Sequence, residues 1–600
     1  MSQSSRTSSV LRKFFEEATD QRLNISDNDH NLRMHTCLKV TEIVQTIADY
    51  VLEDNSRQSS ADLLALALTC RGFYQPALTS LWSELHSVYP ITCLFPGDLY
   101  VTQLSGDESN SSDGEFPPRL RGRLVPVRPI KPADWTRFDF HARRVRVFIS
   151  VESNSKPVNR DFSPVSMQML QLHWKEPLFP NLRRLDWSSS CPHQVQFLSL
   201  FISPSLRDIS LCLDSLWAVQ SILGDLQISS PSIRRAIIVP KASLLFSSSG
   251  RAQVLASVYD TICSWSGLTT IVLPHVPLDK TLFLYLARLP TLIRAKIAIN
   301  SNFHVEECVA TDLSCPSAEF PAFPKLEKLQ LFMFSVDLDY GAAVLRSITS
   351  KTFKTHFLDV TEFPTEEMLA VYIEALSNHP LLDSVRLIRH DGNRNEEIPM
   401  SFKTIRPLLR NQAIKELKVD DIIFNFTDDD AHSMALSWPK LKVLSFITKD
   451  SLFRQPVNCV TVSHGLVHFI HHCPQLHYLS LPFSISAIHN EECSNQSPPN
   501  IYIPPRPATK EFTVGIDVVT ATTEVLVDFA ARLSAVVPDA NVEISEVQTL
   551  SEGMKKKVNE LNKLVRKFTD IRRQERMHAK ESPYVDQGCP NCSEIDQTCG

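Results

Sequence analysis

The sequence predicts an α/β protein in which a three-helix module precedes a long array of repeated strand and helix units. Three observations lead to this prediction. Apolar residues recur at three- and four-residue spacing between Leu38 and Ser87, a unit containing proline and leucine recurs between residues 170 and 550, and amphipathic segments follow several of its copies. A chain of 600 residues with 43% hydrophobic content is long enough to bury a large core.

Composition excludes several classes of function. The net charge of −6 and the pI near 6.4 give no reason to expect nucleic acid or an anionic membrane as a partner. Glycine is scarce, at 15 residues against 38 prolines, and no glycine-rich phosphate-binding loop is found. No apolar run reaches 18 residues, and residues 1–24 hold no secretory signal. We therefore expect a cytoplasmic or nuclear protein with no cofactor and with its 14 cysteines reduced.

The chain divides into five predicted regions. They are a poorly ordered N-terminus over residues 1–30, a helical module over 31–95, a flexible acidic linker over 96–133, the repeat array over 134–550 with an insertion near 484–510, and a basic helix with a cysteine-containing tail over 551–600.

Three short helices account for the first module. Segments 38–47, 62–73 and 76–82 are apolar at helical spacing, and the polar run 55–60 interrupts them. Pro76 suits the first turn of the third helix, where its missing N–H costs nothing. Their apolar residues occupy more than one face, so we expect part of this surface to meet a partner or the following domain.

This segment resembles the fungal form of the F-box. The matches are Leu38, Glu42-Ile43, Leu66, Thr69-Cys70-Arg71, Phe73, Pro76-Ala77-Leu78 and Leu81-Trp82, and the segments Asp134-Trp135-Thr136-Arg137-Phe138 and Arg144-Val145-Arg146 extend them. Thr41 stands where the family usually has proline. The resemblance implies docking on a Skp-type adaptor of a cullin-RING ubiquitin ligase. The residues expected to bind the adaptor are Leu38, Val40, Thr41, Glu42, Ile43, Ile47, Leu63, Leu64, Cys70, Phe73, Leu81 and Trp82.

The repeat array begins with a predicted strand. Val145, Val147 and Ile149 alternate with Arg144 and Arg146, which predicts one buried face. The following unit is a proline, then leucine, two variable residues, leucine, one variable residue and leucine. Its intervals run from 24 residues, between Pro180 and Pro204, to 35, between Pro439 and Pro474, and the longer gap after Pro324 holds a degenerate copy at 352–358. This is the plan of a leucine-rich-repeat solenoid, with parallel strands on the concave face and helices on the convex face.

Residues flanking the second and third leucines of each unit point away from the core, because strand side chains alternate. Basic residues outnumber acidic ones among them, which suggests that the concave face binds an acidic or phosphorylated segment of a protein substrate. A solvated surface without a ligand is the alternative. The candidate substrate-binding residues are Arg184, Arg235, Arg294, Lys296, Lys328, Phe332, Arg386, Lys418 and Tyr478.

Two clusters have residue types that bind metals. Cys589, Cys592 and Cys599 supply too few ligands for a zinc site, and we expect them in a tail. His464, His468, His471, His472 and Cys473 include an i, i+4 histidine pair, yet they precede an ordinary repeat strand. Packing on a helix explains them, so no metal site is predicted.

No catalytic motif is found, and the resemblance implies a non-catalytic substrate receptor of a Skp–cullin–F-box ligase. Two alternatives stay open. One is a leucine-rich scaffold without ligase association, whose N-terminal helices cap the solenoid. The other is an unrecognised hydrolase on an α/β fold, because catalytic triads assemble in space and not in sequence. Segment 554–581 is expected to cap the array as an amphipathic helix, with a nuclear-targeting or anion-binding role as its alternative.

Overall fold

The computed structural model of the chain divides into two compact units, Met1–Ala298 and Ile299–Gly600. The structure describes residues 36–53, 59–86, 89–92, 94–105, 121–150, 171, 177–187, 197–213, 215–241, 244, 248–299, 322–333, 338–362, 364–390, 399–447, 460–461, 464–481, 512–515, 523–536, 540–543 and 552–581. The expected N-terminal segment 1–30, the insertion near 484–510 and the cysteine-containing tail lie outside these residues.

The described part of the first unit begins with the 3-10 turn η2 (Thr36–Lys39) and then contains three helices, as predicted. The third helix starts at Arg71, so the prediction that Pro76 lies in its first turn was wrong: Pro76 is inside the helix, five residues after its start. Val44 and Ala48 are buried on the side of the first helix that meets the third. The Gln45 amide donates to Ser80 Oγ at 2.7 Å, and Ser80 Oγ donates to Asp49 at 2.6 Å, so polar contacts join the same pair of helices. The three helices are α2 (Thr41–Glu53), α3 (Ser59–Thr69) and α4 (Arg71–Ser83).

This helical module continues directly into the sheet. Strand β1 (Glu84–Leu85) follows α4 without a break and pairs in parallel with β4 (Val147–Ser150). The Trp82 ring packs on His141 of helix α6 (Trp135–Ala142), with ring centroids 4.5 Å apart. Burial lowers the pKa of His141 to about 3, so the ring is neutral in this contact. The module and the first repeat therefore share one core.

The segment predicted as a flexible linker contains ordered structure at both ends. Strands β2 (Tyr100–Ser105) and β3 (Arg121–Pro126) form an antiparallel hairpin, with the short elements α5 (Tyr89–Thr92) before it and η3 (Pro132–Asp134) after it. The prediction of a linker over 96–133 was thus wrong for these two ends, where paired backbone groups and buried side chains such as Leu99 and Ile130 hold the chain.

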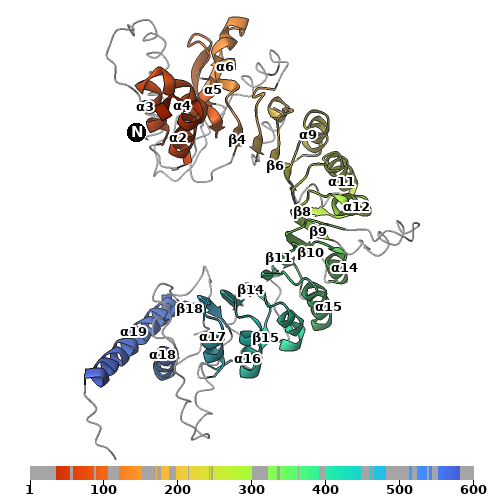
Figure 1. Ribbon diagram of the computed structural model, residues 1–600. Coiled ribbons are helices and arrows are strands. Elements are labelled where there is room, and N and C mark those ends of the chain that lie inside the picture. Colours follow the sequence, from red (N-terminus) through yellow and green to blue (C-terminus); the bar gives the residue numbers. More distant parts are fainter. Residues whose placement is uncertain are drawn as a thin grey trace, which may run out of the picture. The chain divides into compact units, whose positions relative to one another are not determined.

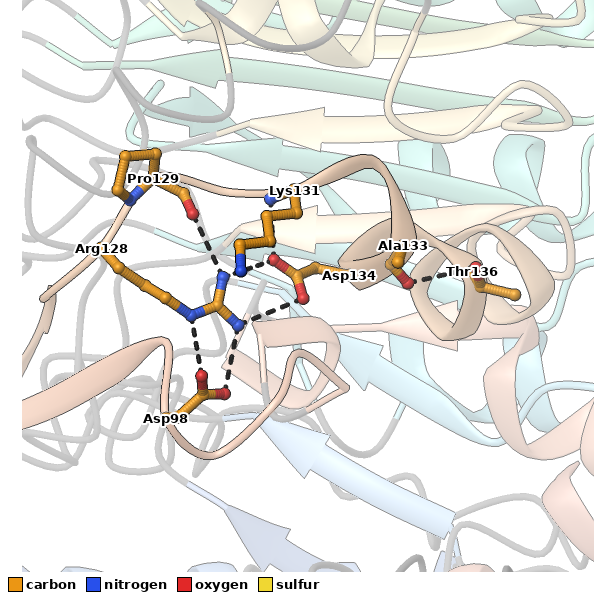
Figure 2. Close-up of polar contacts among 7 residues, drawn as sticks. All are labelled: Asp98, Arg128, Pro129, Lys131, Ala133, Asp134 and Thr136. Atoms are coloured by element: carbon orange, nitrogen blue, oxygen red, sulfur yellow. Dashed lines mark hydrogen bonds and ion pairs between the residues drawn. The ribbon is translucent and has the colours of Figure 1, made fainter.

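One arginine holds the base of this hairpin (Figure 2). The Arg128 guanidinium lies between two carboxylates, with its Nε 2.8 Å from Asp98 and its Nη1 2.7 Å from Asp134. The Lys131 N–H donates to Asp134 at 2.8 Å. The hydrogen bonds from Arg128 lower the pKa of both aspartates, so this contact stabilises the fold above the ordinary carboxyl pKa and weakens as the pH falls through the lowered values.

The remaining strands of the first unit are parallel and follow in chain order, and the longer helices lie along one side of them (Figure 1). The strands are β5 (Arg184–Trp187), β6 (Asp208–Leu213), β7 (Arg235–Pro240), β8 (Thr270–Pro277) and β9 (Arg294–Ile299). The connecting helices are η4 (Leu198–Phe201), α9 (Leu216–Ser229), α11 (Ser248–Cys263) and α12 (Lys280–Arg288).

The second unit repeats the same arrangement, again with parallel strands in chain order. Its strands are β10 (Lys328–Met333), β11 (Thr355–Val360), β12 (Ser384–Arg389), β14 (Glu416–Asp420), β16 (Val443–Ile447), β17 (Tyr478–Ser480), β18 (Phe512–Gly515) and β19 (Ala540–Glu543), with β13 (Met400–Ser401) and β15 (Phe424–Asn425) forming a separate parallel pair. Its helices are α14 (Asp339–Ser347), α15 (Glu366–Ser377), η5 (Phe402–Thr404), η6 (Arg406–Arg410), α16 (Asp428–Ser437), α17 (Gly465–His472), α18 (Thr523–Val536) and α19 (Glu552–Glu581).

The repeat unit predicted from the sequence corresponds to one strand in every described copy. The first leucine or isoleucine of each of the ten copies is at most 2% exposed. The degenerate copy forms β11 and buries Phe353. These ten positions are Leu182, Leu206, Ile233, Leu268, Leu292, Leu326, Leu382, Ile414, Leu441 and Leu476.

Strand β4 departs from its predicted face. Phe148 is buried against Phe179 and Phe201, whereas Val147 and Ile149 are half-buried. Val145 is also buried, but it lies before the strand, in the turn that ends α6. The prediction that Val145, Val147 and Ile149 share one face was wrong, because the strand begins two residues later than the alternation suggested.

The C-terminal helix packs on the end of the second unit as expected. Leu561 and Val565 of α19 are buried, and the Arg572 guanidinium donates to the Ala531 carbonyl of α18 at 3.0 Å. Helical spacing in the sequence places Ile571 on the same face as Leu561 and Val565, but Ile571 is 41% exposed, so the buried part of this face ends before it.

We predict that Gly341→Ala lowers the free energy of unfolding by about 1–3 kcal/mol, the usual cost of overpacking. An added Cβ would lie 2.7 Å from the Tyr372 ring and 2.9 Å from Met333 Sδ. The ring cannot turn away, because Tyr372 is fully buried and its hydroxyl lies 2.6 Å from His356 Nε2. Urea titration gives the measurement.

The matched control is Gly224→Ala in α9, where nothing lies within 4 Å of the added atom. It should stabilise the protein by about 0.5–1 kcal/mol through helix propensity. Equal effects of the two substitutions would contradict the packing described for Gly341.

Candidate functional site

An apolar stripe runs along the outer side of α2. Val40, which directly precedes α2, is 42% exposed, and Ile43, Ile47 and Tyr50 within the helix are 40%, 39% and 68% exposed. Their spacing of three, four and three residues places them on one side of the helix. The opposite face is buried against α4, as described above. The stripe is therefore apolar surface that the described part of the first unit leaves in contact with solvent.

The twelve residues expected to bind an adaptor fall into three groups. Leu63 and Trp82 are buried inside the first unit at 0% and 3% exposure, so their place in that set was wrong. Leu63 lies on α3, which packs on α4, and the Trp82 ring packs on His141 of α6, so both side chains belong to the core of the first unit. Val40, Thr41, Glu42, Ile43 and Ile47 are exposed, and Leu38, Leu64, Cys70, Phe73 and Leu81 are half-buried. Thr41 is the first residue of α2 itself, the position that proline tolerates.

The residues expected to bind a substrate stand at the outward positions of their strands, as predicted. In the first unit, register aligns Arg184, Asp208, Arg235, Thr270 and Arg294 in one row across β5 to β9. Arg235 and Arg294 are exposed. Arg184 donates to Asp186, which raises its pKa. Lys296 is half-buried one row further along.

The outward positions of the second unit carry balanced charge. The Arg386 guanidinium lies 2.8 Å from Asp420, and the Lys418 ammonium lies 2.6 Å from Glu416. The Lys328 ammonium lies 4.5 Å from the centroid of the Phe357 ring. The prediction that basic residues outnumber acidic ones at these positions was wrong for this unit, because acids at neighbouring positions pair with the cations. Phe332 and Tyr478 are half-buried there.

A stronger basic feature lies one residue before the strands of the first unit. Arg146, Arg183, Arg207 and Arg234 occupy the same position in four consecutive repeats, and all four are exposed. We call them the arginine row. Within the described residues, none of these guanidinium groups makes an ion pair or a side-chain hydrogen bond.

Backbone hydrogen bonds set the spacing of this row. The Arg146 carbonyl accepts the N–H groups of Arg183 and Arg184 at 2.7 and 3.0 Å, and the Arg183 carbonyl accepts those of Arg207 and Asp208 at 2.8 and 2.9 Å. The Arg207 carbonyl accepts the N–H group of Arg234 at 2.7 Å in the same way. Neighbouring parallel strands lie about 4.8 Å apart, so successive arginines start from backbones at that spacing.

The equivalent row of the second unit has mixed charge. The same backbone pattern aligns Glu327, Lys354, Asp383, Lys415 and Lys442, and the Lys415 ammonium lies 3.0 Å from Asp383. Like charges on adjacent strands are destabilising, so a row of one sign is not what stability alone would produce. The arginine row is thus the strongest candidate in the first unit for binding an anionic ligand.

Sequence reasoning selected Arg184 and Arg235 but missed the arginine row. The strand pattern covers only residues from the second leucine onward, and the row stands just before it. The signal was present as an arginine directly after the first leucine or isoleucine in Leu182-Arg183, Leu206-Arg207 and Ile233-Arg234.

Comparisons with known proteins do not identify a function for these surfaces. No protein-family model matches the chain, and a search of curated proteins finds no match. In the part of the chain that the structure describes, no helix is both long and apolar enough to cross a membrane.

We predict that Arg207→Glu raises the unfolding midpoint at low ionic strength, by the equivalent of about 0.2–1 kcal/mol, because an acid between Arg183 and Arg234 replaces two repulsions by attractions. Thermal melts followed by circular dichroism measure the effect. It should shrink near 1 M salt, where the Debye length is about 3 Å.

Lys354→Glu is the matched control, because the same charge change in the second unit places an acid between Glu327 and Asp383, replaces two attractions by repulsions and lowers the midpoint. A midpoint for Arg207→Glu that falls, or that does not respond to salt, would show that repulsion within the row is negligible.

Proposed function

We propose that this chain is a non-catalytic substrate receptor of a Skp–cullin–F-box ubiquitin ligase. The helical module would dock on a Skp-type adaptor, and the strand and helix repeats, read as leucine-rich repeats, would hold a protein substrate. The receptor contributes proximity, because a bound substrate presents its lysines to the ubiquitin-conjugating enzyme at high local concentration. No step of bond chemistry is assigned to this chain.

The apolar stripe on α2 is the observation that supports adaptor docking most directly. Its residues Val40, Ile43 and Ile47 fall within the segment that resembles an F-box, and they stay exposed in the described part of the first unit. Apolar side chains at helical spacing are a usual way for a helical module to bind another protein. The module's connection to the sheet through β1 would transmit the adaptor's position to the repeats.

The arginine row supports the second half of the proposal. Exposed guanidinium groups at regular spacing bind carboxylates and phosphates through paired hydrogen bonds. The neighbouring Arg235 and Arg294 widen the same basic surface. The substrate class that fits is an acidic or phosphorylated protein segment lying across the strands of the first unit. Because the arginine row lies just before these strands, the proposed binding site is nearer to the strand beginnings than the one expected from the sequence.

A leucine-rich scaffold without ligase association is the second candidate. The direct passage from α4 into β1 favours it, because a module that shares a core with the first repeat can serve as a cap. A substrate receptor binds a Skp-type adaptor, whereas the scaffold does not.

We predict that the full chain binds a purified Skp-type adaptor and that Ile43→Asp combined with Ile47→Asp weakens this binding by about tenfold or more, because charge would enter an apolar contact. Biolayer interferometry measures both affinities. The matched control is Ile228→Asp, an isoleucine on α9 that is 83% exposed and lies outside the stripe. Failure of the folded wild type to bind would favour the scaffold.

We also predict that a fluorescent peptide rich in phosphoserine and aspartate binds the full chain at low salt and that Arg183→Glu, Arg207→Glu and Arg234→Glu together abolish the binding. Fluorescence anisotropy measures it. The matched control makes the same charge changes in the second unit, at Lys354, Lys415 and Lys442.

Two outcomes would overturn the assigned ligand class. Equal loss with both triple variants would show that binding follows net charge and not the arginine row. Tighter binding of single-stranded RNA than of the peptide would point to nucleic acid in place of a protein.

A further inference from the structure

Three histidines from two consecutive repeats meet between α16 and α17. His432 lies on α16, and His468 and His472 lie one turn apart on α17. One ring nitrogen from each lies within 4.8 Å of the other two, and Nδ1 of His432 is 2.9 Å from Nδ1 of His468. In the sequence only His468 and His472 have the spacing of a metal-binding pair, because His432 belongs to the preceding repeat.

Contacts at both ends of the two helices hold these histidines in place. At one end, Asp428 accepts hydrogen bonds from the Thr461 N–H and hydroxyl, both at 2.8 Å. At the other end, the buried Cys473 thiol donates to the Trp438 carbonyl at 3.4 Å. Gly465 permits the close approach, because a Cβ there would lie 2.4 Å from Asp428 Oδ1. Groups outside the cluster therefore position the rings.

Hydrogen bonding within the cluster does not account for three converging imidazoles. The contact between His432 and His468 uses one donor and one acceptor, and the nearby Asp428 engages Thr461 with both of its oxygens. Burial, and then the neighbouring histidines, lower the pKa of His468 and of His472.

We propose that His432, His468 and His472 bind one divalent transition-metal ion, with Zn²⁺ as the best-fitting ion. Three imidazole nitrogens suit zinc and its neighbours in the first transition row, whereas calcium and magnesium require oxygen ligands. Zinc takes nitrogen ligands at about 2.0–2.1 Å in a tetrahedron, which places the nitrogens about 3.3 Å from one another. The nitrogens of the cluster, 2.9 Å apart in one pair and within 4.8 Å in every pair, lie in the range around this value.

The metal would join two consecutive repeats and leave one coordination position for water or for a ligand from another molecule. Because the ligands come from both helices, the ion binds the folded array better than the unfolded chain and raises its stability. This inference does not depend on the proposed receptor function.

The test is a zinc titration of the full chain against a chromophoric chelator, in a background carrying Cys589→Ser, Cys592→Ser and Cys599→Ser. That background removes the thiols that would compete for the ion. We expect one zinc per chain, and we expect His432→Gln to weaken the affinity by about tenfold or more through loss of one ligand. Cobalt substitution should give a visible absorption spectrum without a thiolate charge-transfer band.

The matched control is His471→Gln, an exposed histidine on the same helix whose nitrogens are outside the cluster. It should keep the wild-type affinity, and zinc should raise its unfolding midpoint as it does for the parent. Absence of stoichiometric zinc in the folded parent would overturn the site. Equal weakening by His432→Gln and His471→Gln would overturn the choice of ligands.

Discussion

One backbone interaction sets the arrangement of both units. The carbonyl of the residue before a strand accepts two N–H groups from the next repeat, as at Arg146 with Arg183 and Arg184 and at Lys354 with Asp383 and Ser384. This pair of hydrogen bonds fixes the register of each repeat on its neighbour. Since register decides which side chains face the core, the buried leucines align as a consequence, and so does every exposed position beside them.

Equivalent positions of successive repeats lie side by side, so a residue type that recurs at one position forms a row on the surface. In the first unit that position holds arginine four times, and in the second unit it holds both acids and lysines. The same folding rule thus produces a continuous basic row in one unit and, in the other, a row of mixed charge in which Lys415 pairs with Asp383. The difference lies in side chains that the core does not constrain, which is where a binding function can vary without loss of the fold.

Contacts between consecutive elements also create features that no single repeat contains. Asp98 and Asp134 meet across Arg128 because a hairpin brings them together (Figure 2). His432 meets His468 because two helices of successive repeats are held side by side by Asp428 and Thr461. The junction of the helical module with the sheet is of the same kind, so the apolar stripe on α2 and the strands of the first unit belong to one folded unit.

The sequence by itself determined the α/β class, the three helices of the module, the strand in each repeat and the buried leucines, because these follow from local periodicity that each segment carries alone. Only the tertiary structure decided which outward charges are paired, as Arg386 is with Asp420, and which stand in a row. It also decided the burial of Leu63 and Trp82 and the meeting of three histidines. Each of these depends on contacts between residues distant in the chain, and periodicity does not encode such contacts.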